Sequence, residues 1–249
     1  MVYLAFTVWL LVIVLTAWGV HRLWGGMIKP KLLNTALLPG TLVAQLGHVL
    51  GLLVTGATIT NTTLYKDDES GEPENTTNPQ PRIPIIGPVV IGLLPLLACG
   101  AAVYFVAREW GRPIIARLTI SPVGPHLPTT LPGVWQLLRD QISLVESLVS
   151  AASVADFSAW PTWLFMYLLT CLVIRSAPFP GNLRGALGAI VVLGIGAATV
   201  TSLFDVADPR VQHAWAVLNL TVAALLFLLL VSLIVRGAVG LVQVLRSDS

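Results

Sequence analysis

Two polar side chains interrupt a long apolar stretch of the chain. Gln45 and His48 lie between Pro39 and Ala57, in a segment whose other residues are mostly aliphatic or small. A polar side chain inside a membrane helix is costly and needs a partner. A histidine at such a place can serve as a metal ligand, but it is equally consistent with a residue that is hydrogen-bonded within a helix bundle. The neighbouring residues decide between these two interpretations.

The residues around His48 resemble the zinc-binding helix of the site-2-protease-type membrane metallopeptidases. That helix carries the motif His-Glu-x-x-His, in which two histidines at i and i+4 face the same side and reach one zinc ion. The glutamate acts as general base on the metal-bound water. The matching frame here is Ala44-Gln45-Leu46-Gly47-His48, preceded by Pro39-Gly40-Thr41 and followed by Thr55-Gly56-Ala57.

Two later stretches extend the resemblance. The segment Ile86–Pro95 is similar to the family's third helix, which glycine and proline mark. The segment Ala177–Ala186 is similar to the late segment that supplies an aspartate as the third zinc ligand, and the resemblance implies that Asn182 stands at that position. The likeness covers residues 36–58, 84–100 and 160–195, about a third of the chain.

Only His48 keeps its residue type among the four positions that the resemblance assigns to the zinc site. Ala44 replaces the first ligand, and Gln45 replaces the general base by an amide that accepts no proton near neutral pH. Asn182 replaces a carboxylate by a neutral and much poorer ligand. A single neutral histidine does not hold zinc firmly, so we expect zinc to be at best a weakly held cofactor.

These departures lead to the hypothesis of a catalytically inactive, metallopeptidase-like protein that binds or organises partner membrane proteins. Natural divergence or deliberate inactivation would produce the same pattern. In the second case the parent is an active intramembrane zinc endopeptidase, so whether the chain belongs to an enzyme stays open. A transporter or channel subunit is a third interpretation, although the apolar segments offer few polar side chains beyond Gln45, His48, Asn182 and Asn219.

The composition is that of a membrane protein. Hydrophobic residues make up 55% of the 249 residues, charged residues make up 10%, and the mean hydropathy is +0.83. A soluble domain carries about 25% charged residues. The net charge of +2 provides no basic tract, which excludes nucleic acid as an expected partner. We expect one all-α integral membrane domain over residues 1–249, surrounded by lipid, in the plasma membrane of a prokaryote.

Six apolar segments are long enough to cross about 30 Å of hydrocarbon at about 1.5 Å per residue. A polar loop at 60–82 separates the second segment from the third. A further segment at 108–158 contains an amphipathic helix, Gly133–Ser153, that lies in the membrane interface or covers the mouth of the bundle. Cys99 and Cys171 fall inside apolar runs, where we expect them to be buried packing residues. The six segments are 3–24, 36–59, 83–107, 159–177, 184–204 and 213–240.

Charges determine the topology only in part. Basic residues follow the first and third segments, which places those loops in the cytoplasm and the acidic 60–82 loop outside. Six crossings then leave either Arg175 and Arg184 or Arg236 and Arg246 on a side that the same rule would not choose. One segment therefore fails to cross, or the amphipathic region crosses as well.

Overall fold

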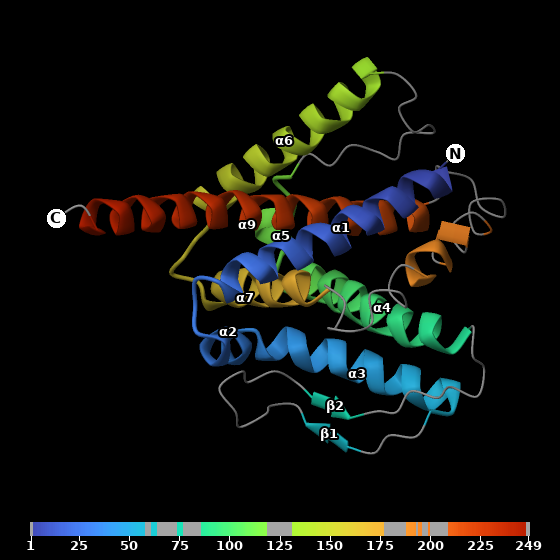
Figure 1. Ribbon diagram of the computed structural model, residues 1–249. Helices are drawn as coiled ribbons and strands as arrows, with labels where there is room; N and C mark the ends of the chain where they lie inside the picture. The colour runs from blue at the N-terminus through green and yellow to red at the C-terminus, as the bar shows by residue number, and fades with distance from the viewer. Residues whose placement is uncertain are drawn as a thin grey trace.

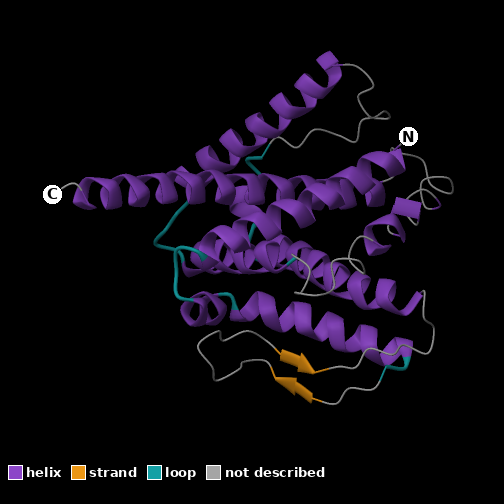
Figure 2. Ribbon diagram, in the orientation of Figure 1, coloured by secondary structure: helices purple, strands orange, loops and turns teal. Residues whose placement is uncertain are grey.

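The protein is a bundle of long helices, as the computed structural model shows (Figures 1 and 2). The structure describes residues 2–57, 61–63, 74–76, 86–118, 131–176, 188–192, 194–195, 199 and 209–247. The residues 188–192 are helical as well. The other helices are α1 (Val2–Gly25), α2 (Pro30–Ala36), α3 (Leu38–Thr55), α4 (Ile86–Glu109), α5 (Arg112–Ile115), α6 (Leu131–Ser153), α7 (Trp160–Arg175) and α9 (Pro209–Ser247).

Four helices in the described part of the chain are long and apolar enough to cross a membrane. They are α1, α3, α4 and α9, and α7 is a shorter apolar helix. This finding supports the prediction of an integral membrane protein. The predicted segment at 159–177 corresponds to the short α7, and most of the predicted segment at 184–204 lies outside the described residues.

The polar loop predicted at 60–82 contains a short hairpin. Strand β1 (Asn61–Thr63) pairs antiparallel with β2 (Glu74–Thr76), with Thr62 opposite Asn75. The strands lie below α3 in Figure 1. Apart from this hairpin, the elements of the described residues are helical, in agreement with the predicted all-α fold.

Helix α4 runs antiparallel to its neighbours α3 and α7. Helix α3 is antiparallel to α4, since Gly47 lies against Pro95 and Gly51 against Ile91. In turn α4 is antiparallel to α7, since Cys99 contacts Arg175 while Gly111 lies against Phe165. Figure 1 shows α1, α4 and α9 running from right to left, and α3 and α7 running from left to right.

Helices α1 and α9 are parallel and joined by side-chain hydrogen bonds. Trp9 Nε1 donates to Asn219 Oδ1 over 2.7 Å, and Trp24 Nε1 donates to Ser232 Oγ over 2.6 Å. The rings of Trp9 and Trp215 stack with centroids 5.5 Å apart. These contacts fix the first and last helices of the chain against each other.

The amphipathic helix predicted at Gly133–Ser153 corresponds to α6. Its buried Leu144 and Leu148 belong to the face that packs on the bundle, whereas Trp135 and Ile142 are exposed. Gln141 Nε2 donates to Asn219 Oδ1 over 3.2 Å and ties α6 to the α1–α9 contact. The first half of α6 leans away from the other helices (Figure 1).

Candidate functional site

Helix α3 is built to hold polar residues in apolar surroundings. Thr41 and Thr55 each donate a hydroxyl hydrogen bond to a backbone carbonyl four residues earlier, over 3.0 and 2.8 Å. Gly56 ends the helix at φ 67°, a left-handed conformation that favours glycine, and the Ala57 N–H donates to the Leu52 carbonyl over 3.0 Å. The register of α3 is therefore fixed at its end, and with it the face on which each side chain lies.

Ala44, Gln45 and His48 lie on the buried face of α3. Gln45 is 2% exposed and His48 is 8% exposed, whereas Leu46 and Leu50 are exposed. The three positions of the predicted zinc helix therefore point into the bundle, as the i, i+3, i+4 spacing of one helix face requires. Asn182, the fourth predicted position, lies outside the described residues.

Two glycines bring the backbones of α3 and α4 into close contact beside these residues. A Cβ atom at Gly47 would lie 2.7 Å from the Leu94 carbonyl oxygen, and one at Gly51 would lie 2.9 Å from Ile91 Cα. Real side chains do not approach backbone so closely, so only glycine fits at both positions. Small residues commonly allow such close packing of membrane helices.

Pro95 lies inside α4 and changes the hydrogen bonding at this contact. A proline has no N–H, so the carbonyl four residues earlier, that of Ile91, loses its partner within the helix. The His48 imidazole of α3 makes a hydrogen bond with the Ile91 backbone. Because a carbonyl can only accept, His48 is the donor. It occupies the place of the N–H that Pro95 lacks, as neighbouring helices often do at prolines in membrane helices.

Gln45 differs from His48 in this respect. Its Oε1 and Nε2 atoms are both buried and have no hydrogen-bond partner among the described residues. A buried amide without partners costs about 1–3 kcal/mol on the scale of protein mutations. Gln45 therefore does not stabilise the α3–α4 contact through its polar end.

The end of α2 and the beginning of α3 pack on α7, where a Cβ added at Gly40 would overlap the Cys171 carbonyl. Cys171 Sγ donates to the Ala36 carbonyl over 3.4 Å, and Tyr167 Oη donates to the same oxygen over 2.8 Å. Arg175 donates to the side chain of Asn34 in α2. Both Cys99 and Cys171 are buried and reduced, which confirms their prediction as packing residues.

Sequence analysis missed two participants in this site. The resemblance uses Pro95 only as a helix marker, although a proline inside an apolar helix leaves a carbonyl without its partner in that helix, which a neighbour must satisfy. The Asn34–Arg175 hydrogen bond joins residues 141 positions apart, and no local sequence pattern predicts it. Both are structural contacts rather than candidates for chemistry.

The arrangement offers one hydrogen-bond donor and one neutral amide, and the described part of the site provides no general base. Among the described residues no group of three histidine, cysteine, aspartate or glutamate side chains could hold a metal ion. The Ala44 methyl group cannot act as a ligand, and His48 is the only ligand type on this face of α3.

Comparisons with protein-family models, with curated proteins and with solved structures found no match to the chain. The likeness of α3, α4 and the segment around Asn182 to site-2-protease-type metallopeptidases therefore stays a prediction from the sequence.

Proposed function

We propose that the chain is a non-catalytic, metallopeptidase-like membrane protein that binds partner membrane proteins. The observation that carries this proposal is the hydrogen bond between His48 and the Ile91 backbone. The histidine that the resemblance assigns to zinc serves here to satisfy a carbonyl that Pro95 frees. With alanine at the first ligand position and an amide at the position of the base, the helix retains its packing without the groups that activate water.

The exposed apolar side of α6 supports partner binding. Trp135, Ile142 and Val149 are 68%, 56% and 44% exposed, and they follow each other at intervals of seven residues on one side of the helix. Exposed apolar patches of this kind mark contacts with protein or membrane. Because α6 stands away from the bundle at its first half, a partner helix can reach this side (Figure 1).

Zinc content tests the non-catalytic part of the proposal. We expect wild-type protein, purified in detergent and freed of loose metal, to hold far less than one zinc per chain. The triple reversion Ala44→His, Gln45→Glu and Asn182→Asp should leave the protein without peptidase activity if the chain diverged naturally. Near-stoichiometric zinc in the wild type, or peptide cleavage by the reverted protein, would instead show a peptidase whose site has been altered.

Photo-crosslinking in cells tests the partner. A benzoylphenylalanine at Ile142 should yield one discrete crosslinked product containing a membrane protein. The matched control carries the same group at Leu53, which is similarly exposed but lies on α3. Equal products from both positions, or none from Ile142, would contradict partner binding by α6.

We further propose that the chain crosses the membrane five times, with α7 and the helical residues 188–192 forming parts of one interrupted crossing. Arg175 at the end of α7 lies beside Cys99, near the middle of α4. A Cβ at Gly188 would lie 2.8 Å from Val89 Cγ2, close to the start of α4, and Gly194 lies against Thr7 near the start of α1. Gly188 and Gly194 therefore lie toward the end of the bundle where α1 and α4 begin, and α9 starts from that same end.

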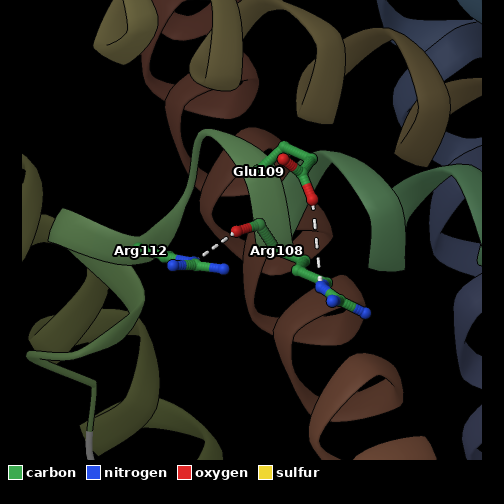
Figure 3. A network of polar contacts seen from close by, with 3 residues as sticks. All are labelled: Arg108, Glu109 and Arg112. Atoms are coloured by element: carbon green, nitrogen blue, oxygen red, sulfur yellow. Dashed lines mark hydrogen bonds and ion pairs between the residues drawn. The ribbon is translucent and has the colours of Figure 1, made fainter.

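Five crossings agree with the distribution of basic residues. The end of the bundle where α4 finishes carries Arg108 and Arg112, where Arg108 Nε lies 3.8 Å from Glu109 Oε1 and Arg112 donates to the Arg108 carbonyl (Figure 3). Arg22 at the end of α1 and Arg236 in the last part of α9 fall toward the same side. The positive-inside rule places this side in the cytoplasm. Five crossings put Arg236 on this side as well, whereas six crossings would put it outside.

Cysteine labelling distinguishes five crossings from six. In a background with Cys99→Ala and Cys171→Ala, we expect Asp68→Cys to react with an impermeant maleimide on intact cells. Ser249→Cys should react only after permeabilisation. Six crossings would put both positions on the outside, and both would then react on intact cells.

A further inference from the structure

A large cavity lies between α1, α4, α9 and the end of α7, and its α4 residues lie mostly on the side of α4 away from α3. Its volume is about 910 Å³, toward the upper end of the range of about 300–1,000 Å³ typical of small-molecule sites. The α4 residues that line it include Leu93, Leu97 and Gly100, a different face from that of Ile91 and Pro95, which meet α3. The cavity is therefore separate from the predicted zinc helix.

The lining is apolar along its length and cationic at one end. Leu10 and Ile13 of α1 and Val217 and Leu218 of α9 form part of the apolar wall. Arg210, an exposed residue in the first turn of α9, lines the other end. The start of a helix also carries the positive end of its dipole, which adds to the charge of the guanidinium.

The cavity extends from a helix end into the depth of the bundle. Along α9 it reaches from Arg210 to Thr221, and along α4 from Leu93 to Tyr104. Eleven helical residues span about 16 Å, roughly half of the hydrocarbon thickness of a bilayer. A ligand that fills it must carry an anionic group near the membrane surface and an apolar body within one leaflet.

We propose that this cavity binds an anionic phospholipid, with an acyl chain between α1, α4 and α9 and the phosphate at Arg210. Arginine pairs with phosphate through charge-assisted hydrogen bonds. The site differs from an ordinary lipid-facing groove because Arg210 and His213 lie at one end of a cavity whose other lining residues are mostly apolar. The inference does not depend on the proposed inactive zinc site.

Filling the cavity tests the acyl-chain position. A Cβ added at Gly100 meets no atom within 4 Å, so Gly100→Leu should fold while occupying the space. Gly237→Leu is the matched control, because Gly237 is also a helical glycine with open space and does not line the cavity. After delipidation and incubation with phosphatidylglycerol, native mass spectrometry should find one retained lipid on the wild type and on Gly237→Leu. Gly100→Leu should lose it.

Replacing the cation tests the head group. With vesicles that contain phosphatidylglycerol and phosphatidylcholine in equal amounts, the wild type should retain the anionic lipid selectively. Arg210→Gln should reduce that preference roughly tenfold, the effect of one charge-assisted hydrogen bond. Since Asp205 and Asp208 precede Arg210, an unchanged preference in Arg210→Gln would overturn the assignment of the phosphate to this residue. Equal retention by Gly100→Leu and Gly237→Leu, or a co-purified protein segment displaced by Gly100→Leu, would overturn the proposal as a whole.

Discussion

Two contacts between long helices satisfy their buried polar groups in different ways. Between α1 and α9, Asn219 accepts from Trp9 over 2.7 Å and from Gln141 of α6 over 3.2 Å. Between α3 and α4, the backbones meet at glycines, and the Gln45 amide has no hydrogen-bond partner among the described residues. In the first contact Asn219 and Gln141 are hydrogen-bonded across helices, although Gln141 Oε1 has no hydrogen-bond partner among the described residues. In the second contact neither polar atom of the Gln45 amide has one.

Hydrogen bonds within the bundle explain some of its buried polar residues, and those residues need no functional explanation. Asn219 needs no ligand to account for it, because its amide oxygen joins three helices. His48 is accounted for as well, since it satisfies the Ile91 carbonyl. The buried Gln45 amide makes no hydrogen bond among the described residues that would offset the cost of burying it. Buried polar groups of this kind are found mainly at functional sites. Of the predicted zinc-site residues that the structure describes, Gln45 is the one that packing does not explain.

The largest expected effect concerns the glycine contact. Gly47→Leu places a side chain where even a Cβ would lie 2.7 Å from the Leu94 carbonyl, so α3 and α4 must separate. We expect a loss of about 3 kcal/mol in the free energy of unfolding, at the upper end of overpacking effects. Unfolding in mixed micelles measures it. Gly19→Leu, where a Cβ meets nothing within 4 Å, is the control and should lose far less. Equal losses would show that α3 and α4 are not in close contact.

Local patterns predicted the helices well, whereas the number of crossings stays a prediction. The apolar runs and the amphipathic pattern of α6 were readable because each is a property of one segment. Whether the run at 184–204 makes a crossing of its own depends on the depth at which α7 ends. The contact of Arg175 with Cys99, 76 residues earlier, places that end beside the middle of α4. Hydropathy treats each run separately and cannot include such a contact.

The candidate site was predictable to a similar extent. A polar residue in an apolar helix is visible in the sequence, so Gln45 and His48 could be selected. The sequence could not predict that His48 is hydrogen-bonded and Gln45 is not, because this depends on which residue of α4 each side chain meets. Asn219 was considered only as a polar residue on a transport path, since its partner Trp9 lies 210 positions away.

A double-mutant cycle tests the role of His48 at the α3–α4 contact. His48→Leu removes the donor to the Ile91 carbonyl and should cost about 1 kcal/mol, in line with hydrogen bonds between membrane helices. Pro95→Ala restores an N–H to the same carbonyl within α4. In the Pro95→Ala background, His48→Leu should therefore cost much less in free energy of unfolding. An unchanged cost in both backgrounds would mean that His48 acts through another contact.

The smallest expected effect has the opposite sign. Gln45→Leu replaces a buried amide without hydrogen bonds by an apolar side chain of similar size, so the free energy of unfolding should stay equal or rise by about 0.5–1 kcal/mol. Asn219→Leu is the counterpart in the α1–α9 contact and should lower it by about 1–2 kcal/mol, because Trp9 and Gln141 lose their acceptor. If Gln45→Leu destabilised the purified protein as much as Asn219→Leu does, the amide would have a partner in solution. That result would favour a polar ligand beside Gln45, the position that the resemblance assigns to the general base.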